Sequence, residues 1–135
     1  MNAKIIYWSQ TGNTEDIAKK ISEDTGIEYV RVSDITASEA INYDTLILGC
    51  PAMGAEELEE DEFRPFFDEL KANLSNQRLF LFGSYGWGGG EWMQNWEQEV
   101  KEAGLNLSCE GLISNSDSSD LDSEAYEKFI NTIKG

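Results

Sequence analysis

Apolar runs alternate with helical patterns along the chain. Five runs of β-branched, aromatic and leucine residues are typical of buried strands. They are Lys4–Trp8, Tyr29–Val32, Thr45–Cys50, Leu79–Tyr85 and Leu105–Ile113. Between these runs, apolar residues recur every three or four positions, which predicts four helices. The apolar faces of these helices consist of Ile17, Ala18 and Ile21; Phe63, Phe66, Phe67 and Leu70; Trp92, Met93, Trp96 and Val100; and Tyr126, Phe129, Ile130 and Ile133.

Strands that alternate with helices predict an α/β fold, in which a five-stranded parallel sheet has helices on both faces. Right-handed crossovers leave few topologies, and the strand order 2-1-3-4-5 is the natural one for five strands. The 135 residues fit one domain, which we place at residues 1–135. We expect Trp92 and Trp96, four residues apart on one helical face, to lie in the core. The polar stretch Ser114–Ser123 is expected to form a surface loop.

Three unusual loops follow the first, third and fourth predicted strands. The first loop is Ser9–Thr14, the second loop is Pro51–Asp61 and the third loop is Ser84–Gly90. In a sheet of this order, ligands bind beyond the carboxyl ends of the strands, near the point where the strand order reverses. The fold would bring these loops together, so the sequence predicts a ligand site where they meet.

The first loop has the composition of an uncharged anion site. Its residues are Ser9, Gln10, Thr11, Gly12, Asn13 and Thr14. The loop would open a helix, whose unpaired N–H groups and dipole attract anions, while its side chains add donors and Gly12 lets the backbone approach closely. Because neither GxGxxG nor GK[ST] occurs in it, a phosphate monoester fits better than a dinucleotide or a triphosphate with Mg²⁺. An ordinary capped helix start is the alternative.

The other two loops are suited to a flat ring. The third loop contributes Ser84, Tyr85, Gly86, Trp87, Gly88 and Gly89, and the second loop contributes Ala52, Met53, Gly54, Ala55 and Glu56. Trp87 has no helical or strand periodicity, so it is expected either to cover something flat or to fold over its own loop. The polarizable Met53 on the opposite side would complete a sandwich around a planar ring. Phosphate, chain and ring describe a mononucleotide, and a flavin suits this sandwich best.

Composition narrows the range of partners. Ten basic and 26 acidic residues give a net charge of −16, which disfavours nucleic acid and anionic membranes and favours basic protein surfaces. Six of the seven residues in Glu56–Glu62 are acidic. Such a run is usually a solvated face, and beside a pocket it also sets the local potential. Histidine, the commonest general base and metal ligand, does not occur, which excludes most hydrolytic mechanisms. We expect neither a catalytic residue nor a metal site.

The sequence also carries signals about the compartment. No apolar run reaches the roughly 20 residues of a membrane span, and the first residues lack the pattern of a signal peptide, so a cytoplasmic protein is expected. Cys50 and Cys109 both lie in apolar, strand-like runs. This position predicts buried free thiols in a reducing compartment.

The pieces IIYWSQTGNTE, LILGCPAMGAEELEEDEFRPFF and LFLFGSYGWGGGEWM, in this order, resemble the short-chain flavodoxins, especially those of anaerobic bacteria. The resemblance extends from about Lys4 to the C-terminal helix. It implies a flavodoxin-like fold, non-covalent FMN and low-potential one-electron transfer on the semiquinone/hydroquinone couple. It further implies a monomer without substrate chemistry of its own that replaces ferredoxin. Its partners would be redox enzymes with basic docking surfaces, such as flavodoxin or ferredoxin reductases and other oxidoreductases.

The resemblance also implies roles for individual residues. The first loop would bind the phosphate, Met53 and Trp87 would flank the isoalloxazine ring, and the backbone of Gly54–Glu56 and Trp87–Gly89 would bind its polar edge. Glu56 would lie near the ring N3. The residues expected to tune the redox properties are Met53, Gly54, Ala55 and Trp87. The chain departs from the family pattern at Gln10, where Gly is usual, at Ala55 and Gly89, where polar residues are usual, and in a shortened segment at Thr25–Gly26–Ile27.

Three other functions compete with the carrier hypothesis. A related flavoprotein activates ribonucleotide reductase, but the acidity of the chain and its GSYGWG segment favour the carrier. An NAD(P)H-dependent flavin or quinone reductase would need a nicotinamide site and usually a dimer. A signalling module of the response-regulator kind would need an aspartate at the end of the third strand, where this sequence has Gly49–Cys50–Pro51.

Overall fold

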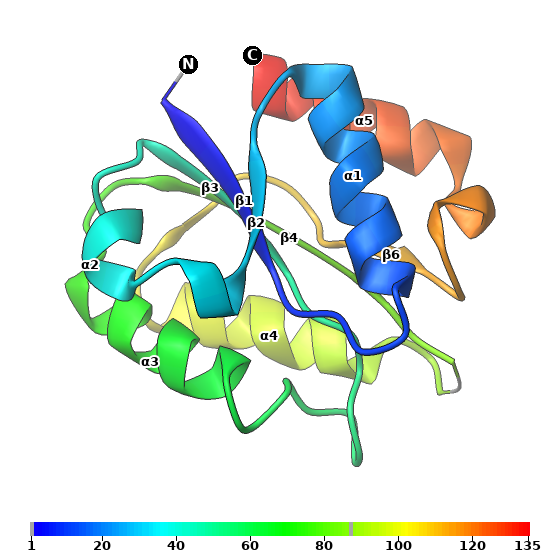
Figure 1. Ribbon diagram of the computed structural model, residues 1–135, viewed down its shortest axis with the longest axis horizontal. Helices are drawn as coiled ribbons and strands as arrows, with labels where there is room; N and C mark the ends of the chain where they lie inside the picture. The colour runs from blue at the N-terminus through cyan, green and yellow to red at the C-terminus, as the bar shows by residue number, and fades with distance from the viewer. Residues whose placement is uncertain (1, 87) are drawn as a thin grey trace.

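The computed structural model describes residues 2–86 and 88–135. Its centre is a parallel sheet with the strand order β2-β1-β3-β4-β5, in which β6 also pairs with β4 (Figure 1). The strands are β1 Ala3–Tyr7, β2 Tyr29–Arg31, β3 Thr45–Gly49, β4 Arg78–Ser84, β5 Asn106–Leu107 and β6 Leu112–Ser114. The predicted α/β fold and the predicted strand order are therefore confirmed.

The prediction of one continuous fifth strand at Leu105–Ile113 is wrong. β5 pairs with the beginning of β4 and β6 pairs with its end, while the residues between them leave the sheet. The cause is the close approach of this segment to the helix that covers it. A Cβ at Gly111 would lie 2.4 Å from the Met93 sulfur, and Gly111 N donates to the Glu97 carboxylate at 2.6 Å. These contacts with the helix draw the backbone away from β4.

Helices cover both faces of the sheet (Figure 1). α1 and α5 pack on one face, and α2, α3 and α4 pack on the other. The helices are α1 Asn13–Thr25, α2 Ala37–Ala40, α3 Phe63–Asn73, α4 Glu91–Glu102 and α5 Ser123–Lys134. The four predicted apolar faces lie in α1, α3, α4 and α5. The sequence prediction missed α2, because four residues are too short for a periodic signal, although Thr36 and Glu39 form a capping box at its start.

The two tryptophans of α4 lie in the core as predicted. Trp92 and Trp96 are each 1% exposed. The ring of Trp96 packs edge-on against Phe63 and Phe67 of α3, with centroid distances of 5.4 and 5.9 Å. Truncation of a buried aromatic side chain costs about 3–5 kcal/mol of stability. This cluster therefore contributes strongly to the packing of α3 against α4. Phe66, expected on the same buried face, is only partly buried.

The two cysteines differ in their environment. Cys50 is fully buried and free, and its burial raises the pKa of the thiol to about 12. Cys109 is also free but only partly buried, so the prediction that both thiols are buried is wrong for this residue. Cys109 lies in the segment between β5 and β6 that leaves the sheet, which explains its exposure.

Two glycines bring the carboxyl ends of β3 and β4 close together. A Cβ at Gly49 would lie 2.2 Å from the ring of Phe82, and a Cβ at Gly83 would lie 2.2 Å from the carbonyl oxygen of Cys50. The same Cys50 carbonyl accepts a hydrogen bond from the buried indole Nε1 of Trp92 at 3.0 Å. The second and third loops therefore leave the sheet from closely packed backbone that α4 holds in place.

The acidic run Glu56–Glu62 contains a structural cap, which the interpretation as a solvated face did not anticipate. Glu59 is only 5% exposed. Its carboxylate accepts hydrogen bonds from the backbone N–H groups of Asp61, Glu62 and Phe63, each at 2.8 Å. These bonds satisfy donors at the N-terminus of α3 that have no intrahelical acceptor, and the negative charge favours the positive end of the helix dipole.

We expect Glu59→Ala to lower the free energy of unfolding by about 1–3 kcal/mol, because several buried N–H groups lose their acceptor. Urea denaturation of the variant beside the parent chain measures this loss. Glu60→Ala is the matched control, since Glu60 is exposed in the same run and its neighbours are other carboxylates. Equal losses in the two variants would contradict the capping role of Glu59.

Candidate functional site

The three loops meet at the carboxyl end of the sheet, at the end of the molecule opposite the chain termini (Figure 1). The hydroxyl groups of Thr14 in the first loop and Ser84 in the third loop form a hydrogen bond of 2.7 Å. Both residues are buried, with 1% and 5% exposure. The second loop joins them because Ala52 N donates to the carbonyl oxygen of Ser84 at 3.0 Å. Three segments distant in sequence are therefore tied together by short hydrogen bonds.

The first loop holds its shape around one hydroxyl group. Ser9 Oγ accepts hydrogen bonds from Gly12 N at 3.1 Å and from Glu15 N at 3.3 Å, so its own proton is left to donate elsewhere. Gly12, with a φ of 97°, is the N-cap of α1. The first N–H groups of α1 have no intrahelical acceptor. The loop can therefore offer backbone and hydroxyl donors to an anion.

One predicted donor also joins two of the loops. The side chain of Thr14 was expected to add a donor for an anion, but its hydroxyl is buried against Ser84. Thr11 and Gln10 are exposed, and Asn13 is partly buried. Their side chains are accessible to a ligand, whereas Thr14 joins two loops.

The sequence analysis missed a cation beside the first loop. Arg31, at the end of β2, donates from Nη2 to the carbonyl oxygen of Ser9 at 3.0 Å. The loop itself contains no Lys or Arg, and only the parallel register, which pairs Tyr7 of β1 with Arg31, brings this side chain to it. An order of strands with β2 beside β1 was predicted, but the register that would have found Arg31 was not.

The second loop contains a tight turn. Met53 and Glu57 exchange two backbone hydrogen bonds of 2.9 Å, which leaves Gly54, Ala55 and Glu56 as the turn. Gly54 has a φ of 49° and Glu56 a φ of 61°. A positive φ is common for glycine and uncommon for glutamate. Gly54 and Ala55 are exposed and Met53 is partly buried, so the turn presents its backbone to solvent.

The unusual backbone of Glu56 directs its side chain toward the N-terminus of α4. One carboxylate oxygen, Oε2, accepts a hydrogen bond from Trp92 N at 3.0 Å. The other, Oε1, is buried and has no hydrogen-bond donor among the described residues. A buried acceptor without a partner is costly. Oε1 is therefore a candidate acceptor for a ligand N–H group.

The third loop places a second carboxylate beside Glu56. Glu91 accepts a hydrogen bond from Gly89 N at 2.9 Å. The backbone N–H groups of Glu91 and Gly89 hold the pKa of Glu91 below its usual range. Trp87, the aromatic residue predicted to cover the ring, lies outside the described residues.

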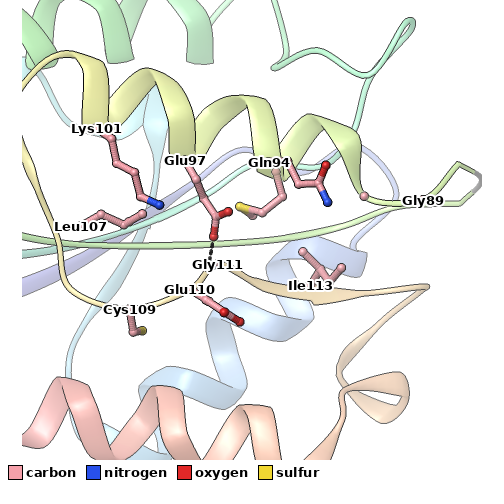
Figure 2. Close-up of a pocket in the computed structure, with 11 residues that line it drawn as sticks. Gly89, Gln94, Glu97, Lys101, Leu107, Cys109, Glu110, Gly111 and Ile113 are labelled. Atoms are coloured by element: carbon pink, nitrogen blue, oxygen red, sulfur yellow. Dashed lines mark hydrogen bonds between the residues drawn. The ribbon is translucent and has the colours of Figure 1, made fainter.

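Two cavities adjoin these loops. One, of about 550 Å³, lies between α4 and the segment that joins β5 to β6 (Figure 2). Glu97 and Lys101 of α4 line it, and the bond from Gly111 N to Glu97 crosses it. Of the described residues that line this cavity, two belong to the third loop and none to the first or second loop. It is therefore distinct from the place where the three loops meet.

The other cavity, of about 450 Å³, lies between the second loop, α3 and α4. Four glutamates contribute to its lining, together with one arginine. They are Glu56, Glu57, Glu60, Glu99 and Arg64. Glu60 lies so close to Glu57 that their hydrogen bond and mutual repulsion raise the pKa of the Glu60 carboxyl. This flank of the site is thus strongly acidic.

A family model described as Flavodoxin matches residues 5–129. The chain belongs to the flavodoxin family. It is 41% identical to the flavodoxin of Clostridium beijerinckii over 129 residues, which cover 92% of this chain and 94% of that protein. It is 44% identical to the flavodoxin of Megasphaera elsdenii over 109 residues, which cover 77% and 80%. The solution structure of the two-electron reduced M. elsdenii flavodoxin matches with a TM-score of 0.87 and 38% identity, covering 98% and 99% of the two chains.

The predicted resemblance to flavodoxins of anaerobic bacteria is therefore confirmed. Flavodoxins are electron-transfer proteins, and membership of the family implies a flavin cofactor. The described residues fit such a group in two respects. The first loop offers uncharged donors to a phosphate, and Glu56 Oε1 is a buried acceptor without a donor. Among the described residues, no helix has the length and apolar character needed to cross a membrane.

We expect Gly88→Ala to destabilise the third loop. Gly88 has a φ of 87°, and an added Cβ would lie 2.0 Å from Glu56 Oε1. Glu56 would have to move away from Trp92 N, and the backbone would be strained, at a combined cost of about 2 kcal/mol. Gly86→Ala is the control, because an added Cβ there meets no atom within 4 Å. Thermal unfolding of both variants tests the difference, and equal stability would show that Gly88 is not the constrained position.

Proposed function

We propose that residues 1–135 form one domain that binds FMN non-covalently and carries single electrons between redox enzymes. The proposed carrier works at low potential, in place of ferredoxin, and has no substrate chemistry of its own. The observation that carries this proposal is the junction of the three loops through Thr14, Ser84 and Ala52. It joins a loop whose uncharged donors suit an anion to two loops that suit a planar ring. Membership of the flavodoxin family supports the same function.

The flavin supplies the redox chemistry, and the chain supplies its binding and environment. The first loop, Ser9–Thr14, would hold the phosphate through backbone and hydroxyl donors. Glu56 would accept a hydrogen bond from N3–H, and Met53 and Trp87 would flank the ring. The remaining proposed contacts are with the backbone of Ala52, Gly54, Ala55, Ser84, Tyr85, Gly86, Gly88 and Gly89. Exclusion of water by the flanking side chains would strengthen these polar contacts.

Charge supports the proposed partners. The net charge of −16 and the four glutamates that line the cavity between the second loop, α3 and α4 favour redox enzymes with basic docking surfaces. The raised pKa of Glu60 beside Glu57 reflects a crowding of carboxylates that a cationic partner would relieve. We further propose a cytoplasmic monomer that binds neither nucleic acid nor membranes.

Titration of the purified chain with FMN and riboflavin tests the proposed cofactor. We expect flavin absorption bands and much tighter binding of FMN, because only FMN has a phosphate. Thr11→Ala, which removes one exposed donor of the first loop, should weaken FMN binding by roughly 1.5–3 kcal/mol, or about tenfold to a hundredfold, and leave riboflavin binding unchanged. Equal affinity for FMN and riboflavin would contradict the phosphate loop. Bleaching of the flavin by NADPH would favour a reductase instead of a carrier.

Gly54 is the proposed hinge of the second loop. Rotation of the peptide after Gly54 would turn its carbonyl toward the flavin N5. There the carbonyl oxygen would accept a hydrogen bond from a protonated N5. The rotated turn requires a positive φ near this position, which glycine reaches at no steric cost and alanine reaches only with strain. Gly54 has a φ of 49°, and an added Cβ meets no atom within 4 Å, so the effect of an alanine would come from the backbone. We therefore expect Gly54→Ala to lower the potential for the first electron by on the order of 50 mV, the equivalent of about 1 kcal/mol of strain, and to keep FMN binding in the oxidised state. A redox titration beside the parent chain measures this shift. Gly104→Ala is the control, because Gly104 also has a positive φ, of 75°, and an added Cβ there meets no atom within 4 Å. Equal potentials in the parent chain and Gly54→Ala would remove the hinge.

A further inference from the structure

We propose that Arg31 is a positioning residue of the first loop. Its guanidinium group holds the Ser9 carbonyl so that the Gln10 N–H faces the phosphate of the ligand, and it supplies the positive charge that the loop itself lacks. The ligand class is a phosphate monoester, so this inference rests on the FMN binding proposed above.

The position of Arg31 follows from the sheet. Arg31 is the last residue of β2 and pairs with Tyr7, the last residue of β1. Its side chain crosses the Tyr7 ring, with the guanidinium carbon 5.6 Å from the ring centroid. From there Nη2 reaches the Ser9 carbonyl at 3.0 Å. Arg31 is partly buried, so packing against Tyr7 limits the number of conformations it can adopt.

Pinning the Ser9 carbonyl fixes the direction of the next N–H group. The carbonyl of Ser9 and the N–H of Gln10 belong to one planar trans peptide and point in opposite directions. Because the Ser9 carbonyl points to the Arg31 guanidinium, the Gln10 N–H points away from that guanidinium. Ser9 Oγ is held independently by Gly12 N and Glu15 N. The start of the loop is thus fixed from both sides.

Among the described residues, no carboxylate forms a direct ion pair with Arg31. The six ion pairs found among the described residues do not include it. The nearby acid of α1, Glu15, accepts a hydrogen bond from the Tyr7 hydroxyl at 2.8 Å. Burial and this bond to Glu15 raise the pKa of Tyr7 to about 12, so the phenol keeps its proton at neutral pH. Asp16, the other acid in the first turn, accepts from Ser118 N at 3.0 Å.

This arrangement separates the charges at the start of α1. Tyr7 and Ser118 donate to the two carboxylates of Glu15 and Asp16, while the guanidinium donates to the neutral carbonyl of Ser9 and lies over the neutral Tyr7 ring. Across the Ser9–Gln10 peptide, this partly buried guanidinium attracts a bound phosphate through the longer-range interaction of opposite charges. Arg31 therefore gives an acidic chain a local preference for a dianion.

The test compares Arg31→Gln, Arg31→Lys and Arg78→Gln. Arg78 is the matched control, because it is also partly buried and donates to the carbonyls of Thr132 and Ile133, but at the opposite end of the sheet. Dissociation constants for FMN and riboflavin are measured by fluorescence quenching at low and high salt. The ³¹P chemical shift of bound FMN provides a spectroscopic signature at the phosphate.

We expect Arg31→Gln to weaken FMN binding about tenfold, the equivalent of ~1.4 kcal/mol, with riboflavin binding unchanged. It should also reduce the salt dependence of FMN binding and move the ³¹P shift. Arg31→Lys should restore part of the FMN preference, and Arg78→Gln should keep the ratio of FMN to riboflavin affinity. Arg31→Met, which keeps the apolar stem over Tyr7, replaces Arg31→Gln if that variant does not fold.

A parallel fall in FMN and riboflavin affinity would overturn the proposal, because it would show a general structural role. The proposal would also be overturned if Arg31→Lys restored none of the preference for FMN over riboflavin that Arg31→Gln loses. Failure of the FMN proposal itself would be seen separately, in a parent chain that binds neither flavin or binds riboflavin as tightly as FMN.

Discussion

The hydrogen bond between the Thr14 and Ser84 hydroxyl groups is the constraint on which the candidate site depends. Two buried hydroxyls must satisfy each other, since leaving either one unpaired would cost free energy. The bond joins residues 70 positions apart and fixes the start of α1 against the end of β4. The close approach of Gly83 to the Cys50 carbonyl then fixes the second loop against the third. Each loop is placed by the sheet beneath it more than by its own sequence.

Three helices begin at this end of the sheet, and the chain treats their N-termini differently. Glu59 accepts three N–H bonds at the start of α3, and Glu56 accepts one at the start of α4. At the start of α1, the side-chain acceptor found among the described residues is the neutral hydroxyl of Ser9. A helix N-terminus favours negative charge. The acids in the first turn of α1, Glu15 and Asp16, accept hydrogen bonds from Tyr7 and Ser118 instead of from the first N–H groups of the helix. The first loop is therefore the place left for an external anion.

Features that follow from the periodic spacing of apolar residues could be predicted from the sequence. Features that depend on contacts between distant segments, such as strand register, could not. Alternation of apolar runs predicted the sheet order, and spacing placed Trp92 and Trp96 in the core. An acidic run looks the same whether its members are solvated or bonded, so the capping role of Glu59 was not visible. The break in the predicted fifth strand arises from contacts of Gly111 with α4, which no local pattern records. Arg31 required the pairing of β1 with β2.

The distribution of charge around the site explains how a strongly acidic chain can accommodate a phosphate. Screening limits the reach of exposed charges to about 8 Å at physiological salt, so local groups matter more at the first loop than the net charge of −16. There the nearest acids are bonded to neutral donors, and Arg31 lies against the Ser9 carbonyl. The glutamates of the second loop, α3 and α4 gather on the other flank. One flank thus suits an anionic ligand and the other a cationic protein surface, so ligand binding and partner docking place no conflicting demands on the same residues.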